Sequence, residues 1–428
     1  MYIGRREFLQ TLGMAALAGL NLKRIHAGQT RFENMPADVY EVPSFGNLSI
    51  LHITDVHAQL LPIIYREPSI KIASNKNKAS PQNLVGDNFL TYYGISPNSA
   101  QAYAFTHLNF KDASEKYGKL GGFAHLASLI KHIRSQRKEV LLLDGGDSWT
   151  GSATALWTNA QDMVDANLKL GVDIMTGHWE FTYGAQRVKD VVDNDFKGKI
   201  DFLAHNVVDS EFEDPVFKPY SIREINGVAV AVIGQAFPYT PISNPSYMVP
   251  QWRFGIQELE LQKIVNEVRG KGAQIVSILS HNGLAVDVKL ASRLENVDII
   301  FGGHSHDPTP KPLVVANPSG QTLVINSGAM GKYLAVLDLE VKNNRLQAYQ
   351  FKLLPVFSNL LSADKPMQEH INKVRKPFES RLNEKLAVTE HLLYRADAIM
   401  GSFDQIILDI LIQTQNADIA LLRAFALD

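Results

Sequence analysis

The feature that most constrains this chain is a series of short, almost wholly apolar runs separated by amphipathic stretches. The runs 48–54 (LSILHIT), 228–234 (VAVAVIG) and 273–280 (AQIVSILS) lack regular polar alternation. A strand with one face in water alternates polar and apolar residues, so these runs predict strands that are covered on both faces. The same pattern recurs at 139–144, 172–176, 201–206, 297–303, 322–327 and 333–341.

The stretches between the runs carry helical spacing. Residues 121–138 and 254–272 place apolar side chains three and four positions apart, which predicts helices with one apolar stripe. Strands and helices in this order predict an α/β fold with layered sheets and flanking helices. At 428 residues and 45% hydrophobic content, the chain is long enough to bury a large core and to form more than one domain.

Charge and cysteine content limit the classes of partner. The net charge of −2 gives no concentrated basic field for nucleic acid or an anionic membrane, so we expect neither as a partner. The chain has no cysteine, which excludes disulfides and thiolate metal ligands and is compatible with the periplasm.

The N-terminus predicts export. Arg5 and Arg6 precede a short apolar stretch interrupted by glycine, and Ala27 offers a small residue for cleavage. We interpret residues 1–27 as a twin-arginine signal peptide that engages the Tat export machinery and delivers the protein to the periplasm without stable membrane association. The alternative is a retained N-terminal anchor helix.

The remaining sequence divides into a main domain and a shorter C-terminal part. The strand-rich domain spans 46–355, and a polar then aromatic insertion at about 64–118 has the length of an active-site lid or binding loop. Residues 356–385 form a charged helical stretch that we interpret as an interdomain linker. Residues 386–428 begin a further helix-and-strand unit, which looks unfinished.

Carboxylates and imidazoles follow several of the predicted strands. In layered α/β proteins, the carboxyl ends of strands converge on ligand sites. Both residue types bind Mn, Fe or Zn, and a carboxylate can bridge two hydrolytic ions. Each segment alone is a weak signal, but the ordered series predicts a dinuclear metal site. The candidates are Asp55, His57, Asp144, Asp147, His178, His281, His304 and His306.

Other polar residues allow two readings. We expect Asp144 to brace its turn or a ligand instead of binding metal, and His52, inside a strand, to be a core or supporting histidine. His205 and Asn206 follow a strand and could contact substrate or form a structural pair. His107 lies in the aromatic insertion, where a role in a lid is one interpretation.

The ordered motifs resemble the calcineurin-type metallophosphoesterases, and in particular the exported two-domain 5'-nucleotidases. The resemblance covers about 46–355 and rests on D-x-H, G-G-D, G-x-x-E-F, S-H-N-G and G-G-H-S-H-D in that order. It implies a four-layer α-β-β-α sandwich with metals at its rim. It also implies that 386–428 is the truncated start of a C-terminal substrate-binding domain.

The same resemblance implies a ligand set for two divalent ions. We expect manganese first, with zinc or iron as alternatives. One ion would be held by Asp55, His57 and His306, and the other by His178, His281 and His304, with Asp147 bridging the two.

The sequence departs from the nucleotidase pattern next to His178. In the nucleotidases position 178 is normally asparagine, position 306 is often glutamine, and position 179 normally holds a histidine that pairs with an aspartate. Here these pair positions hold Trp179 and Thr182. An imidazole at 178 can still bind metal, but tryptophan cannot protonate the leaving oxygen of a phosphate ester.

A narrower resemblance accommodates this departure. GHWEFTYG, the twin-arginine signal and AYAFTHLNF resemble the SoxB thiosulfohydrolases. That family hydrolyses a cysteine S-thiosulfonate on the flexible arm of the carrier SoxYZ and releases sulfate. Its leaving group, a persulfide sulfur, is less basic than an alkoxide and needs less protonation. Trp179 and Tyr183 would then shape a slot for the extended arm.

Two alternative functions stay open at this point. The first is a 5'-nucleotidase or cyclic phosphodiesterase with an altered proton donor, which predicts turnover of AMP or a phosphate ester. The second is a non-catalytic fragment. It is suggested by the ending ADIALLRAFALD, where related proteins continue into a substrate-binding segment.

Overall fold

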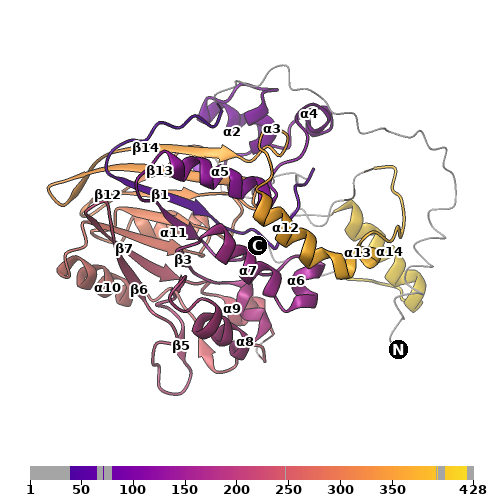
Figure 1. Ribbon diagram of the computed structural model, residues 1–428. Helices are drawn as coiled ribbons and strands as arrows, with labels where there is room; N and C mark the ends of the chain where they lie inside the picture. Colours follow the sequence, from indigo (N-terminus) through magenta and orange to yellow (C-terminus); the bar gives the residue numbers. More distant parts are fainter. Residues whose placement is uncertain are drawn as a thin grey trace.

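The computed structural model describes residues 39–64, 71, 80–245, 247–391, 393 and 401–421 (Figure 1). The predicted signal peptide, residues 1–27, lies outside the described residues, as does much of the first half of the insertion. The ending of the chain, residues 422–428, lies outside them as well.

The first sheet has six strands in the order β14-β13-β1-β2-β3-β4. Strands β1 to β4 run parallel to one another, whereas β13 and β14 are antiparallel additions at one edge. The bounds are β1 Leu48–Ile53, β2 Leu141–Asp144, β3 Ile174–Met175, β4 Asp201–Phe202, β13 Tyr333–Lys342 and β14 Arg345–Pro355.

The second sheet has the order β11-β12-β10-β9-β7-β6. Its four inner strands are parallel, and β6 and β11 are antiparallel edge strands. The bounds are β6 Tyr220–Ile225, β7 Val228–Gln235, β9 Ile275–Ser280, β10 Ile299–Gly302, β11 Leu313–Asn317 and β12 Gly320–Asn326. A separate pair is formed by β5 (Val208–Asp209) and β8 (Trp252–Arg253).

The apolar runs fold as strands that are buried on both faces. In β1, Leu48 and Ile50 join a core cluster that also contains side chains of the second sheet, such as Phe301. Leu51 and Ile53 join a different cluster formed with helices. Successive side chains of a strand point to opposite faces, so a run that is apolar throughout fits a strand between two apolar layers.

Helices cover the outer face of each sheet. The helices α5 (Phe123–Ser135), α7 (Gln161–Leu170) and α12 (Lys365–Arg375) contact one another and cover the first sheet. The helices α10 (Glu258–Gly270) and α11 (Leu284–Ala291) cover the second sheet. The predicted four-layer α-β-β-α fold is therefore confirmed (Figure 1).

The described part of the insertion is built into the core. It forms the 3-10 turn η1 (Pro81–Asn83) and the helices α2 (Gly86–Tyr93), α3 (Ala100–Phe105) and α4 (Phe110–Tyr117). The ring of Phe105 stacks on that of Tyr333 in β13, with centroids 5.4 Å apart. The aromatic residues of the insertion are therefore explained in part by packing against β13 and the core cluster that Phe105 joins.

The remaining elements are short, except for one C-terminal helix. They are α6 (Ala153–Thr158), the 3-10 turn η2 (Trp179–Tyr183), α8 (Ala185–Asp190), the π-helical turn η3 (Val191–Asp195), α9 (Thr240–Ser243), η4 (Lys376–Phe378), α13 (Glu379–Leu382) and α14 (Ser402–Gln415). Within the stretch interpreted as a linker, α12 buries Met367 and Ile371 against the helical layer. No helix in the described ranges combines the length and apolar character that crossing a lipid bilayer requires.

Candidate active site

The predicted ligands lie on loops that leave the carboxyl ends of five strands. The first sheet contributes the loops after β1, β2 and β3, and the second contributes those after β9 and β10. Because parallel strands end at the same edge of their sheet, these loops converge at one rim of the molecule. The structure brings together all seven predicted ligands: Asp55, His57, Asp147, His178, His281, His304 and His306.

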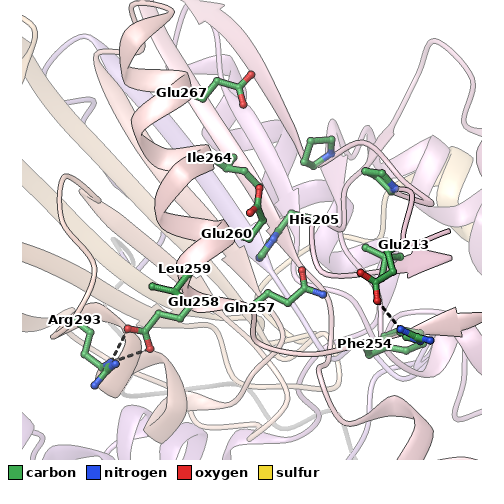
Figure 2. Close-up of a pocket in the computed structure, with 14 residues that line it drawn as sticks. His205, Glu213, Phe254, Gln257, Glu258, Leu259, Glu260, Ile264, Glu267 and Arg293 are labelled. Carbon is green, nitrogen blue, oxygen red and sulfur yellow. Dashed lines mark hydrogen bonds and ion pairs between the residues drawn. The ribbon is translucent and has the colours of Figure 1, made fainter. Parts of the chain in front are cut away.

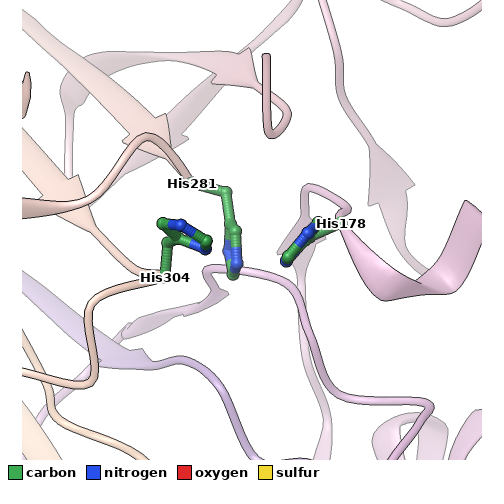
Figure 3. Close-up of side chains that lie close together, drawn as sticks. All are labelled: His178, His281 and His304. Atoms are coloured by element: carbon green, nitrogen blue, oxygen red, sulfur yellow. The ribbon is translucent and has the colours of Figure 1, made fainter. Parts of the chain in front are cut away.

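The first group consists of His178, His281 and His304, and we call it the buried trio. One ring nitrogen of each lies within 4.8 Å of the others. The side chains of His178 and His281 are 1% and 0% exposed. Figure 3 shows the three imidazoles converging from separate segments of the chain.

The second group consists of Asp55, His57 and His306, and we call it the open trio. Its ligand atoms also lie within 4.8 Å of one another. The Nε2 atoms of His57 and His306 are 2.8 Å apart, and Oδ1 of Asp55 is 3.5 Å from Nε2 of His306. The side chains of His57 and His306 are 10% and 24% exposed, so this group faces the solvent more than the buried trio does.

Asp147 lies between the two groups. Its Oδ2 atom is 3.1 Å from Nδ1 of His178 and 3.6 Å from Nε2 of His281, both in the buried trio. The same oxygen is 3.6 Å from Nε2 of His57 in the open trio. This is the placement that a carboxylate bridging two ions requires.

Several polar atoms in the cluster are buried without a hydrogen bond. They are Oδ1 of Asp147, Nε2 of His178, Nε2 of His281 and Nδ1 of His304, which find no partner among the residues that the structure describes. Buried polar atoms are normally hydrogen-bonded, so several orphaned ligand atoms at one place need an explanation. Imidazole nitrogens and carboxylate oxygens are donors that suit Mn, Fe or Zn, and the residues therefore fit a pair of divalent ions.

Burial keeps most of the imidazoles neutral, which is the form that binds metal. It lowers the pKa of His178 to about 4 despite the opposing charge of Asp147. Burial, with repulsion from neighbouring imidazoles, also lowers the pKa of His304 and of His306. These rings therefore offer free lone pairs at neutral pH.

The pKa values of His281 and Asp147 show where the site favours positive charge. Burial alone would lower the pKa of His281, but Asp55 and Asp147 outweigh it and raise that pKa to about 10. Burial would raise the pKa of Asp147, yet the imidazoles of His57 and His178 hold it well below its usual range. In the absence of metal, a proton on His281 balances the negative charge of the two carboxylates. A divalent cation at the same place would carry more positive charge and would be attracted more strongly than the proton.

Hydrogen bonds orient two parts of the cluster. Nδ1 of His281 lies 2.7 Å from the carbonyl oxygen of Gly145, so it donates there and directs Nε2 toward the other ligands. The backbone N–H of His304 donates to both carboxylate oxygens of Asp55, at 2.9 and 3.1 Å. These bonds connect loops of the first sheet with loops of the second.

Glu180 braces the loops that carry Asp147 and His178, a role that the sequence analysis missed. Its buried carboxylate accepts backbone N–H groups from Asp147 (3.1 Å), Ser148 (2.7 Å), Trp149 (3.3 Å) and His178 (2.7 Å). The available signal was an acidic residue within an aromatic run that follows a buried strand.

Phe237 is the second residue that the sequence analysis missed. It follows β7, is 6% exposed, and its ring centroid lies 4.1 Å from that of His178 and 4.2 Å from that of His304. An apolar residue after an apolar strand gives no local sign of a functional role.

The cluster is built on unusual backbone geometry. Asp55, His57, Asp147, His304 and His306 have φ angles of 51°, 51°, 62°, 73° and 54°. Side chains other than glycine adopt this left-handed region rarely, and such residues concentrate at functional sites.

Trp179 and Tyr183 lie at the two ends of η2. Trp179 is partly buried, and its ring centroid is 5.2 Å from that of His178. The Tyr183 hydroxyl donates to the carbonyl oxygen of Trp149 at 3.0 Å. The Thr182 hydroxyl donates to the carbonyl oxygen of Trp179 at 2.7 Å. Of these side chains, it is Trp179 that adjoins a predicted ligand.

Two of the other sequence interpretations are confirmed. Asp144 accepts hydrogen bonds from the backbone of Gly146 (3.0 Å) and the hydroxyl of Ser148 (2.6 Å), so it braces its turn. His52 is fully buried in β1, with Nδ1 2.7 Å from the hydroxyl of Ser327. His107 packs against Phe110 of α4, with ring centroids 5.7 Å apart.

His205 and Asn206 have different surroundings. Asn206 is fully buried and exchanges hydrogen bonds of 2.8 Å with the backbone of Ala236, which makes it structural. Nε2 of His205 lies 2.5 Å from Oε1 of Gln235. His205 also lines an open hollow of about 990 Å³ beside α10, shown in Figure 2, whose lining includes none of the seven clustered residues.

A family-wide sequence pattern matches most of the main domain of this chain. The sequence pattern of the family described as Calcineurin-like phosphoesterase matches residues 48–308. The chain belongs to this family. The match begins with β1 and ends just after His306, so it contains all seven clustered residues of this calcineurin-like phosphoesterase.

Among curated proteins, this calcineurin-like phosphoesterase is similar to 5'-nucleotidases. A snake venom 5'-nucleotidase from Gloydius brevicauda is 26% identical over 312 residues, which are 66% of this chain and 52% of the relative. A 5'-nucleotidase from Rattus norvegicus is 26% identical over 292 residues, which cover 63% and 50% of the two chains. The chain thus spans about half the length of the curated relatives it matches.

Solved structures show the same fold. The structure titled sulfate thiohydrolase SoxB in complex with glycerol, from Thermus thermophilus, superposes with a TM-score of 0.83 at 32% identity. The match covers 88% of this chain and 69% of that one. A 5'-nucleotidase precursor from Thermus thermophilus gives a TM-score of 0.68 at 24% identity and covers 86% and 67%.

Proposed function

We propose that this calcineurin-like phosphoesterase is a periplasmic dimetal thiosulfohydrolase. Its substrate would be the cysteine S-thiosulfonate on the flexible arm of the carrier SoxYZ, and its product sulfate. The observation that carries the proposal is Trp179, whose indole adjoins His178 with ring centroids 5.2 Å apart. An indole cannot supply the proton that an alkoxide leaving group needs, whereas a persulfide sulfur leaves with less protonation.

The similarity to the SoxB structure supports this substrate class. That match has the higher identity and TM-score of the two Thermus thermophilus structures described above. An identity of 32% over most of the chain is more than a shared fold requires, so it favours a shared chemistry. The SoxYZ carrier as partner is our own proposal and rests on the resemblance of GHWEFTYG and AYAFTHLNF to the thiosulfohydrolases.

The chain's own residues would each have a defined part in the reaction. Asp147 would join the open and buried trios, and Glu180 would hold the loops of Asp147 and His178 in register. Trp179 would present an apolar surface to the leaving sulfur. Two divalent ions, for which we propose manganese, would supply an acidified water and positive charge to stabilise the sulfonate oxygens.

A 5'-nucleotidase is the second candidate, because the curated relatives described above carry that name. It would use the same ligands and act on a phosphate ester. The two candidates differ in the leaving atom, oxygen or sulfur, and therefore in their need for a proton donor.

The deciding experiment compares two classes of substrate, a thiosulfonate and phosphate esters, with one manganese-reconstituted preparation. Sulfate release from thiosulfonate-loaded SoxYZ is measured beside phosphate release from AMP and from a chromogenic phosphate ester. We expect sulfate from the carrier and little phosphate from the esters. Phosphate release alone would assign the chain to the nucleotidases. Because the chain spans about half the length of its curated relatives, the same assay is also run with a version fused to the C-terminal part of such a relative.

A substitution at position 179 tests the role of the missing proton donor. Trp179→His, alone and with Thr182→Asp, should raise phosphate-ester hydrolysis on the order of 100-fold, at the lower end of what a general acid contributes. Trp179→Phe is the matched control, because it keeps an apolar ring and adds no acid. If the histidine and phenylalanine variants hydrolyse the ester equally, the absence of a proton donor at position 179 does not limit ester hydrolysis, and the role proposed for Trp179 is wrong.

A further inference from the structure

The two ligand groups differ in how their imidazoles are supported. In the open trio, the rings of His57 and His306 contact each other, with centroids 4.8 Å apart, and His306 is partly exposed. In the buried trio, His281 is fixed by its hydrogen bond to the carbonyl of Gly145. Nδ1 of His178 lies 3.1 Å from Oδ2 of Asp147, while Nδ1 of His304 is one of the orphaned ligand atoms of the cluster among the residues that the structure describes.

Phe237 packs against the buried trio in addition to these hydrogen bonds. Its ring centroid lies 4.1 Å from that of His178, 4.2 Å from that of His304 and 6.4 Å from that of His281. A single buried ring therefore touches two imidazoles at van der Waals distance and approaches the third. It is tilted by 50° to the ring of His178 and by 34° to that of His304.

The need for such support follows from the geometry of histidine. The χ2 torsion, which turns the imidazole about its bond to Cβ, has only weak preferences. A metal-binding ring is therefore usually fixed by a hydrogen bond from its second nitrogen. A neighbouring ring can limit the same rotation by contact. A ring wedged against both His178 and His304 limits two ligands at once.

We propose that Phe237 is a positioning residue that makes the buried trio the tighter of two unequal metal sites. The chain would then take up its ions in order, with the buried trio filled first and the open trio second. This inference rests on the pair of divalent ions in the proposed function, but not on the substrate.

Metal titration of the full chain tests the proposal without any activity assay. The chain is stripped with a chelator and titrated with Mn²⁺, and binding is followed by metal analysis and by the Mn²⁺ electron paramagnetic resonance signal. We expect two binding classes of unequal affinity. His281→Ala should remove the tighter class and His57→Ala the weaker one, which assigns each class to its trio.

Phe237→Leu should then weaken the tighter class by about 10- to 100-fold, the usual cost of losing a residue that supports a metal ligand. The weaker class should change by less than about threefold. Phe237→Tyr keeps the ring and should restore the tighter affinity. Tyr239→Leu is the matched control, because Tyr239 contacts Phe237, with centroids 5.9 Å apart, and is 46% exposed.

The outcomes separate the proposal from its premise. If Phe237→Leu leaves both affinities unchanged, or weakens both equally, the positioning role is wrong. If the wild-type chain binds fewer than two ions, the ion pair of the proposed function fails and the order of filling fails with it. The unfolding midpoint of each metal-free variant shows whether the fold is retained. Phe237→Met replaces Phe237→Leu if the leucine variant does not fold.

Discussion

At the scale of single residues, Asp147 is the side chain on which both halves of the candidate site depend. Its Oδ2 atom approaches His178 and His281 on one side and His57 on the other. We expect Asp147→Ala to lower the bound metal from two ions per chain. We also expect it to reduce activity by more than the roughly 10- to 100-fold that is typical of supporting residues. Metal analysis and the sulfate assay measure both effects, with Asp147→Asn as a variant of the same shape. Full activity with two bound ions would disprove the bridging role.

A second residue, Asp287 of α11, gives a prediction about pH. It is fully buried and accepts hydrogen bonds from the side chains of Ser280 (2.6 Å) and Asn282 (3.2 Å). Burial raises its pKa from 3.8 to about 7, against the lowering effect of these hydrogen bonds. The folded state therefore holds this proton more firmly than the unfolded state. The resulting stability is fully present below about pH 4 and is lost as the pH rises through about 7.

Asp287→Asn should remove that pH dependence, because an amide keeps the shape and does not ionise. Relative to wild type, its free energy of unfolding should rise between pH 5 and pH 8, on the order of 2 kcal/mol. Urea denaturation of both proteins in saturating Mn²⁺ at the two pH values gives the difference. A difference that stays constant with pH would show that Asp287 does not titrate in this range.

At the scale of elements, a buried ion pair fastens the helical layer to the first sheet. Arg137, which follows α5, donates to both carboxylate oxygens of Asp338 in β13, at 2.9 and 2.6 Å. The two side chains are 2% and 1% exposed, and the hydroxyl of Ser49 in β1 also donates to Asp338. Through one carboxylate, this pair joins the segment after α5 to the two strands β1 and β13.

Breaking this pair should cost much more than breaking a surface pair. We expect Arg137→Ala to lower the free energy of unfolding by about 3–5 kcal/mol, because it leaves Asp338 buried without its counter-ion. Lys263→Ala is the control. Its pair with Glu260 is exposed and should be worth within about 1 kcal/mol. Denaturation midpoints compare the two variants, and equal losses would contradict the argument from burial.

At the scale of the whole molecule, the metal site joins the two sheets at one rim. The first sheet carries Asp55, Asp147 and His178, and the second carries His281 and the two histidines after β10. Ions bound between these loops would stabilise the packing of one sheet against the other. They would also stabilise loops whose backbone lies in the left-handed region at several ligands.

Removing metal should therefore lower the stability of the whole fold. An ion present at 100 times its Kd adds about 2.7 kcal/mol to the stability of the folded state. We expect a chelator to lower the Tm and to raise hydrogen exchange in the ligand loops, with little change in the β13–β14 pair. Back-titration with Mn²⁺ should reverse both effects. An unchanged Tm would show that the clustered residues hold no structural ion.

The sequence allowed the main elements to be predicted wherever burial is continuous. The runs 48–54, 228–234 and 273–280 became β1, β7 and β9, because strands covered on both faces must be apolar throughout. The edge strand β6 was missed, because its side chains are largely in contact with water. The pairing partners set the length of β3, which spans only Ile174–Met175, and no local pattern encodes that length.

By itself, the sequence determined which residues could bind metal. A carboxylate or imidazole directly after a buried strand must lie at a carboxyl edge, so Asp55 and His281 could be named without a structure. The tertiary structure alone decided how these residues meet. It placed the ring of Phe237 against those of His178 and His304. It also brought the carboxylate of Glu180 within hydrogen-bond distance of the backbone of the loops that carry Asp147 and His178. The physical reason is that residue patterns report which faces are buried, whereas sheet order and register decide which buried faces touch.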